Sequence, residues 1–179
     1  VRGQAREQLA NFYRARDEFE KSNAVYSRYL EEFPDTSLRP HLELAMSVNL
    51  RQAGKEEAAR ELFEPAMETM LASAEAELDK QSRVRMLQDI ARYYELMGNL
   101  EKAEEMKKRV MGEMPMTQVA LDTQFDIARM YLQAGEQKKG FGVLEQIKSE
   151  NPETEIAERA QSWIDGSRQR AAEAGASPA

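Results

Sequence analysis

The sequence contains no cysteine, and His41 is its only histidine among 179 residues. The absence of cysteine excludes disulfides, cysteine-based zinc sites and thiol nucleophiles. One histidine does not suffice for a multi-histidine metal site or an ordinary histidine-containing triad. We therefore expect a chain that is not an enzyme and needs no cofactor or metal, with His41 as an ordinary surface residue.

Aromatic residues are few, at 7%, and no apolar run approaches the ~20 residues that a membrane helix needs. The net charge of -7 argues against nucleic acid as a partner, because a phosphate backbone is bound by clustered lysine and arginine. An apolar fraction of 41% is nevertheless too large for a disordered acidic chain. The composition therefore indicates a folded domain without a membrane span and without nucleic acid as its partner.

Three glycines, Gly54, Gly98 and Gly135, recur in one pattern, each ending an amphipathic helical segment and opening another. Glycine suits this place because a helix often ends in a left-handed residue. A small residue for close helix approach follows each glycine at five residues, and apolar residues precede it at eight and four residues. The small residues are Ala59, Ala103 and Gly140, and the apolar pairs are Met46 and Leu50, Ile90 and Tyr94, and Ile127 and Tyr131.

An earlier unit follows the same spacing, with Leu9 and Tyr13 before its turn, but Asp17 stands where the other units have glycine. Prolines end three of the units, at Pro34, Pro115 and Pro152. The second unit is longer than its neighbours, which predicts one long helix from Lys55 to about Asp79, kinked near Pro65 and projecting at one edge.

This pattern resembles the tetratricopeptide repeat (TPR) family, although the tryptophan common early in the family motif is absent. The resemblance implies an all-α fold, a right-handed α-α superhelix (a TPR solenoid) of four helix-turn-helix repeats followed by a C-terminal capping helix. We expect one domain over residues 1–170, followed by a flexible tail. The expected repeats span 3–35, 36–80, 81–116 and 117–152, with the cap at 153–170 and the tail at 171–179.

Two linkers share the pattern proline, acidic residue, threonine. They are Pro34-Asp35-Thr36 and Pro152-Glu153-Thr154, and the threonine of each is a candidate helix N-cap. These linkers are similar to those of bacterial cell-envelope TPR proteins such as the Tol–Pal coordinator and the outer-membrane assembly lipoproteins. Val1 is not an initiator methionine, so we also expect a trimmed segment. We therefore place the chain in the bacterial periplasm or cell envelope, with the cytoplasm as the alternative.

The resemblance assigns partner binding to the concave face that the first helix of each repeat builds. The candidate residues there are Asn11, Leu44, Val48, Arg51, Gln88, Arg92, Phe125 and Arg129. We expect the apolar members to supply burial and the arginines to orient acidic groups of a peptide. Because Asp89 and Asp126 stand three residues before Arg92 and Arg129, pairing within the helix is the competing interpretation.

The leading functional hypothesis is therefore a non-catalytic protein-binding or peptide-binding scaffold in a bacterial multiprotein assembly. The alternative is self-association into a homo-oligomer, through the projecting helix from Pro65 to Asp79 and the methionine-rich edge from Met106 to Met116. The competing interpretation of these methionines is gap-filling core. Trp163 is expected in the core of the cap rather than as a binding anchor.

Overall fold

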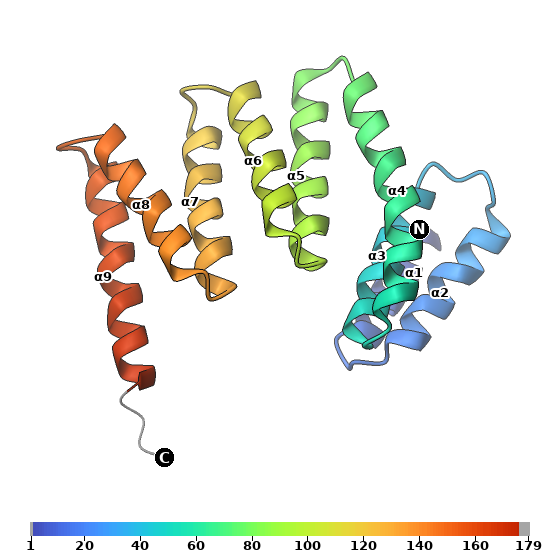
Figure 1. Cartoon of the computed structure of the whole chain (residues 1–179). Helices are drawn as coiled ribbons and strands as arrows, with labels where there is room; N and C mark the ends of the chain where they lie inside the picture. Colours follow the sequence, from blue (N-terminus) through green and yellow to red (C-terminus); the bar gives the residue numbers. More distant parts are fainter. Residues whose placement is uncertain (1, 176–179) are drawn as a thin grey trace. The chain divides into compact units, whose positions relative to one another are not determined.

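The computed structural model describes the backbone of residues 2–175 and the side chains of residues 6–169. Within this part of the chain there are nine α-helices and no strand, and helix makes up 82% (Figure 1). The helices are α1 (Arg2–Arg14), α2 (Phe19–Glu32), α3 (Arg39–Gln52), α4 (Glu56–Ala76), α5 (Lys80–Leu96), α6 (Leu100–Glu113), α7 (Gln118–Gln133), α8 (Gln137–Glu150) and α9 (Glu155–Gly175). The all-α prediction is confirmed.

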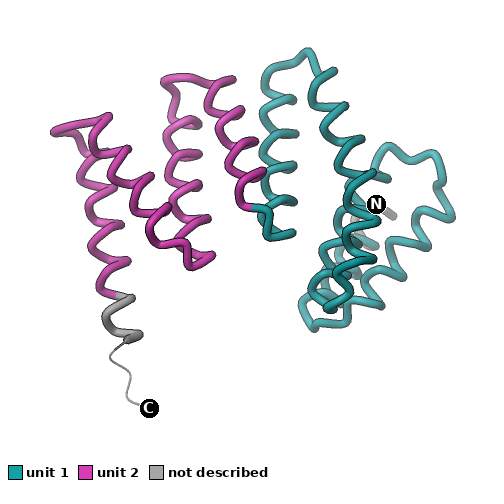
Figure 2. Tube along the Cα trace, in the orientation of Figure 1, with its two compact units in different colours: residues 1–99 teal, residues 100–179 magenta. Residues whose placement is uncertain are grey.

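The helices group into two compact units, residues 1–99 with α1 to α5 and residues 100–179 with α6 to α9 (Figure 2). In unit 1, α1 packs on α2, α2 on α3, and α3 on α4. In unit 2, α6 packs on α7, α7 on α8, and α8 on α9. The division falls inside the third expected repeat, 81–116, whose two helices belong to different units.

Four turns between paired helices share one backbone geometry. Gly54, Gly98 and Gly135 have φ of 75°, 75° and 80°, the left-handed conformation that the sequence predicts for them. Asp17 adopts the same conformation at φ 58°. The residue after each of these four donates its N–H to the carbonyl four residues before the turn residue, over 2.8–3.0 Å. The turn with aspartate is therefore equivalent to the three with glycine.

The small residues after the turns lie where two helices meet closely. Ala59 and Ala103 are fully buried. Gly140 is buried as well, and a Cβ placed on it would lie 2.6 Å from Cγ of Leu132 on α7. Gly140 therefore permits a close approach of α7 and α8, as its spacing predicts.

The long helix α4 contains Pro65 in its interior and ends at Ala76, slightly before the expected Asp79. One face of α4 is buried, with Phe63 packed edge-on against Tyr94 of α5 at a centroid distance of 5.7 Å. The outer face of its last turns is exposed, with alanine, serine and glutamate. The predicted long helix is confirmed, whereas its kink near Pro65, its projection at one edge and self-association through this segment stay predictions.

The methionines from Met106 to Met116 occupy different environments. Met106 is buried in unit 2, Met111 and Met114 are half-buried, and Met116 is fully exposed. Self-association through this edge stays a prediction.

A buried polar cluster joins α2 to α3 in unit 1. The Asn49 amide donates to Oγ of Ser22 at 3.0 Å and to Oδ1 of Asn23 at 2.7 Å, and Asn23 donates to the carbonyl of Met46 at 3.2 Å. Such a cluster fixes the register of two packed helices, because breaking it leaves buried polar groups without partners. Residue spacing alone does not reveal this cluster.

The core of unit 2 lies between α7, α8 and α9. Its buried side chains are Phe125, Ala128, Leu144, Ile147, Ala160 and Ile164, and Ile156 and Trp163 of α9 pack against them. The capping role expected for this helix is therefore present. The helix extends to Gly175, past the cap boundary expected at residue 170. The rest of the expected tail, residues 176–179, lies outside the described residues.

The linkers before α7 and α9 share a cap. Thr117 and Thr154 accept hydrogen bonds from the N–H groups of Ala120 and Ala157, at 3.3 and 3.4 Å. The residues before these threonines, Met116 and Glu153, have φ of 55° and 59°. Thr36 differs from both, since it accepts from Leu38 and α3 begins only at Arg39. The N-cap prediction is wrong for Thr36, because two further residues separate it from the helix.

Candidate functional site

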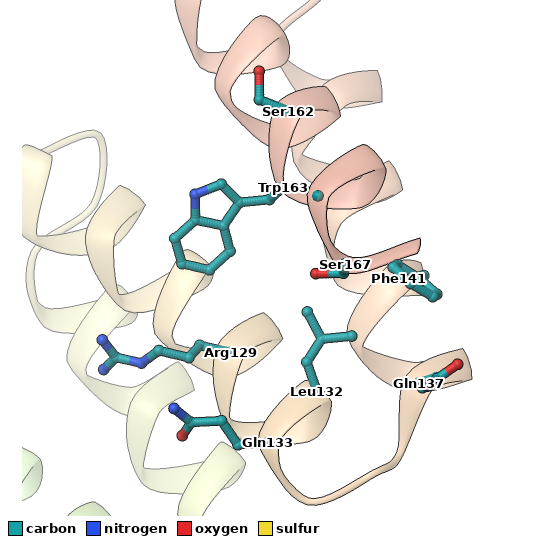
Figure 3. Close-up of a pocket in the computed structure, with 9 residues that line it drawn as sticks. Arg129, Leu132, Gln133, Gln137, Phe141, Ser162, Trp163 and Ser167 are labelled. Carbon is teal, nitrogen blue, oxygen red and sulfur yellow. The ribbon is translucent and has the colours of Figure 1, made fainter. Parts of the chain in front are cut away.

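Unit 2 contains a groove of about 670 Å³ between its last three helices (Figure 3). This volume lies within the ~300–1,000 Å³ typical of ligand pockets. The lining residues are Arg129, Leu132 and Gln133 of α7, Gln137 and Phe141 of α8, and Ser162, Trp163, Gly166 and Ser167 of α9. The groove therefore belongs to one compact unit and needs no contribution from the other.

The groove arises from small residues that bring α8 close to α7 and from a large residue on α9. Gly140 places α8 against Leu132 of α7. Trp163 packs on the buried ring of Phe125 at a centroid distance of 5.4 Å, and its own side chain is only partly buried. Figure 3 shows the indole of Trp163 facing the space that Arg129 and Leu132 border from α7. Trp163 therefore serves the core and the groove together.

The chemistry of the groove is apolar with amide and hydroxyl groups. Leu132, Phe141 and Trp163 provide apolar walls, and Gln133 and Gln137 carry amides that both donate and accept hydrogen bonds. An extended peptide offers matching N–H and C=O groups because it has no internal hydrogen bonds. This arrangement suits a peptide segment with one large apolar side chain.

Arg129 lines the groove, and two further arginines of unit 2 lie over aromatic rings. Arg129 contacts Asp126 at 2.8 Å, which confirms the intrahelical pairing considered for this residue. Arg159 contacts Asp122 at 3.5 Å and covers the Phe125 ring at 4.3 Å. Arg168 lies 5.7 Å from the ring of Phe141. A bound acidic group would have to displace Asp126 from Arg129, so charge contributes less to this site than apolar burial.

A hydrogen bond between α6 and α7 fixes the helix that carries Arg129 and Leu132. The hydroxyl of Tyr131 donates to a carboxylate oxygen of Glu104, which also pairs with Lys108 at 2.9 Å. Burial alone would raise the pKa of Glu104, but these two donors outweigh it and lower that pKa. Burial and the same hydrogen bond raise the pKa of Tyr131. The pair therefore stays in its charge-assisted form at neutral pH.

The three apolar residues expected to contact a partner are core residues. Leu44, Val48 and Phe125 are exposed by 0%, 2% and 1%. The assignment of these residues to a binding surface is corrected, because they face the neighbouring helices within their units. Phe125 still affects the groove indirectly, since Trp163 packs on it.

The polar candidates lie in different environments. Arg51 is half-buried, and its Nη1 donates to the carbonyl of Leu96 at 2.9 Å, which ties α3 to the end of α5. Asn11, Gln88 and Arg92 are exposed in unit 1. Of all eight candidates, only Arg129 lines the groove.

The remaining groove residues were not predicted as a site. The sequence singles out Trp163 and Phe141 only as a cap residue and as the centre of a Gly-Phe-Gly segment. Their joint position depends on how α9 packs beside α7, and no local spacing shows that. The useful signal was the single tryptophan on the helix that follows the last complete repeat.

The described side chains form no cluster of three or more histidine, cysteine, aspartate or glutamate residues that would hold a metal ion. None of the described helices is both long enough and apolar enough to span a membrane. His41 is partly buried rather than an ordinary surface residue, and its carbonyl accepts the hydroxyl of Tyr93 at 3.3 Å.

Comparison with known proteins gives a likeness in structure only. No family model and no curated protein matches the sequence. A crystal structure of nearly identical TPR-like repeats, from a protein of Podosopora anserina assigned as a kinesin light chain, matches with a TM-score of 0.55. It is 19% identical, and the match covers 96% of this chain and 90% of that one. A single-substitution variant of that protein matches with a TM-score of 0.54. The helices, their turns and this likeness together show that the chain has a TPR-like helical-repeat fold.

Proposed function

We propose that this chain is a non-catalytic scaffold that holds an extended peptide segment of a partner protein in the groove of unit 2. The observation that carries the proposal is the partly exposed Trp163 in a groove whose other walls are Leu132 and Phe141. Tryptophan is enriched among residues that dominate binding energy, because it buries a large area at little entropic cost.

The expected mechanism is insertion of one apolar side chain of the peptide between α7 and α9. Gln133 and Gln137 would then hydrogen-bond the peptide backbone on either side. Such a contact, with one buried anchor and few charged pairs, predicts a dissociation constant in the micromolar range, about 1–100 μM.

We further propose that the scaffold belongs to a bacterial multiprotein assembly of the cell envelope. The support is the proline-x-threonine linker, of which the segment Pro115-Met116-Thr117 is another copy, with the same cap as Pro152-Glu153-Thr154. Fractionation of the source cells tests this part separately, and recovery in the cytoplasm alone would contradict it.

Peptides selected by phage display on the wild-type chain provide the test of the binding function. The variant Ser162→Arg places a long side chain at the groove, whereas Ser149→Arg places it elsewhere on unit 2. Both serines are exposed and donate only to a carbonyl of their own helix, at 3.0 and 2.9 Å, so the variants are matched in structural cost.

We expect Ser162→Arg to weaken the selected peptides at least about tenfold and Ser149→Arg to leave them unchanged, measured by fluorescence anisotropy of labelled peptides. Equal affinities for both variants would place peptide binding outside the groove. Failure to select any peptide would contradict the binding function itself.

A further inference from the structure

Helix α1 exposes two apolar side chains at positions that are buried or half-buried in the other repeats. Leu9 and Phe12 are exposed by 43% and 54%. They stand eight and five residues before the turn residue Asp17. In the other repeats the first of these positions holds Met46, Ile90 and Ile127, and the second holds Asn49, Tyr93 and Met130. Ile90 and Ile127 are exposed by only 0% and 3%, and Asn49 and Met130 by 0% and 5%.

The reason for this burial is visible where one repeat meets the next. In unit 1, α2 lies on this face of α3, since the Asn23 amide donates to the carbonyl of Met46 and the Asn49 amide donates to Oγ of Ser22. In unit 2, α6 packs on α7, whose Ile127 and Met130 are buried. Among the described residues no helix covers the equivalent face of α1, so the face has the shape and apolarity of a helix-packing surface without its helix.

Beside this face, six charged groups form two clusters, each with one carboxylate and two cations. Glu18 contacts both Arg16 and Lys21, and Glu32 contacts both Arg6 and Arg28. Each carboxylate is thus shared by two cations, which leaves two positive charges in excess on a chain whose net charge is -7. Glu7, the acidic residue of α1 itself, stands two residues before Leu9, and this spacing corresponds to about 200° around the helix, so Glu7 points away from Leu9.

A groove of about 430 Å³ continues this face between α1 and α2. It is lined by Arg6, Leu9, Tyr13, Lys21, Ala24, Val25, Arg28 and Glu32. The guanidinium of Arg6 lies 5.6 and 5.8 Å from the centroids of the Tyr29 and Phe33 rings, beside the groove.

We propose that the α1 face, meaning Leu9 and Phe12 with Arg6, Lys21 and Arg28, docks an acidic amphipathic helix of a partner protein. The helix would pack as α2 packs on α3, with its apolar stripe on Leu9 and Phe12 and its carboxylates toward the three cations. A second copy of this chain fits less well, since it would bring the same positive excess and a net charge of -7. This site lies in unit 1 and is separate from the groove of unit 2.

The test uses two synthetic helical peptides of about 16 residues with the same leucine stripe at i, i+3, i+4 and i+7. One peptide carries glutamate at the flanking positions and the other carries lysine. Binding to the whole chain is measured by fluorescence anisotropy. The double variant Leu9→Gln and Phe12→Gln removes the apolar contact, and Leu78→Gln is its matched control because Leu78 is 93% exposed. Arg28→Glu tests the charge, with Lys80→Glu as its control.

We expect the acidic peptide to bind at least about tenfold more tightly than the basic one, and to weaken at least about tenfold with the double variant and with Arg28→Glu. Leu78→Gln, Lys80→Glu and the groove variant Ser162→Arg should leave it unchanged, so this result is independent of the proposed peptide site. No binding of the acidic peptide at about 1 mM, or equal binding of both peptides, would overturn the proposal. A wild-type dimer by sedimentation that the double variant dissociates would overturn it too, by assigning the face to a second copy.

Discussion

A single residue in the left-handed conformation forms each turn between paired helices, and steric limits determine which residues adopt that conformation. The left-handed region is open to glycine and costs a residue with a Cβ about 1 kcal/mol or more. Gly54, Gly98 and Gly135 meet this requirement, whereas Asp17 adopts the same conformation at φ 58°. The glycine spacing was therefore a reliable guide to where helices end, and it identified the aspartate turn by position.

Replacement of Asp17 by glycine should stabilise unit 1. The left-handed conformation becomes strain-free, while the added entropy of the unfolded glycine offsets part of the gain, so we expect about 0.5–1 kcal/mol. Urea unfolding followed by circular dichroism measures this. The reverse change, Gly54→Ala, should destabilise by at least a similar amount, because a Cβ there meets no atom within 4 Å and only the backbone opposes it. A loss of stability in Asp17→Gly would contradict the strain argument.

The lowered pKa of Glu104 predicts that the free energy of unfolding of unit 2 decreases in acid. Its pKa is lowered from the ordinary 4.5 in the folded chain, so its contribution is complete above that value and disappears as the pH falls through the lowered pKa. Glu104→Gln should remove about 1–2 kcal/mol at neutral pH and less in acid, where the wild-type carboxyl is protonated. Urea unfolding of the wild type and the variant, at neutral pH and at a pH below the lowered pKa, measures this difference in unfolding free energy. A variant as costly in acid as at neutral pH would refute the assignment, and exposed Glu101→Gln is the control.

Helices and their packing were more predictable than the surfaces they present. Apolar residues four positions apart, turn glycines and terminal prolines predict helix ends closely, because these signals are local. The burial of Leu44, Val48 and Phe125 was not predicted, since the family pattern places the first helices at the concave face without showing which side chains turn into the core. The buried Asn49 and the groove at Trp163 depend on contacts between helices distant in sequence, which local spacing does not encode.

Arg51 shows how packing reassigns a residue from binding to structure. Its guanidinium bonds the carbonyl of Leu96, and its Nη2 lies 2.9 Å from where a Cβ on Gly98 would stand. Arg51→Ala should therefore destabilise unit 1 by about 1–3 kcal/mol and leave peptide binding at the unit 2 groove unchanged. Arg92→Ala is the exposed control for stability. Loss of groove binding in Arg51→Ala, with stability unchanged, would restore Arg51 as a binding residue.

At the scale of the whole molecule, the chain combines two compact units with different surfaces. Unit 1 carries the α1 face, apolar with a positive border, and unit 2 carries the groove with the only tryptophan. The two proposals together predict that the chain binds two segments at once, since each proposed site uses its own helices. The groove is the proposed peptide site, and the partly exposed Trp163 is its largest lining side chain.

The most direct measurement is the ¹H–¹⁵N correlation spectrum of the whole chain with and without a peptide selected on it. The indole N–H of Trp163 gives one resonance that no other residue can produce. We predict that this resonance and the side-chain amides of Gln133 and Gln137 shift on binding and saturate with the affinity found by anisotropy. A bound peptide that leaves the indole resonance in place and shifts only signals of unit 1 would contradict the account.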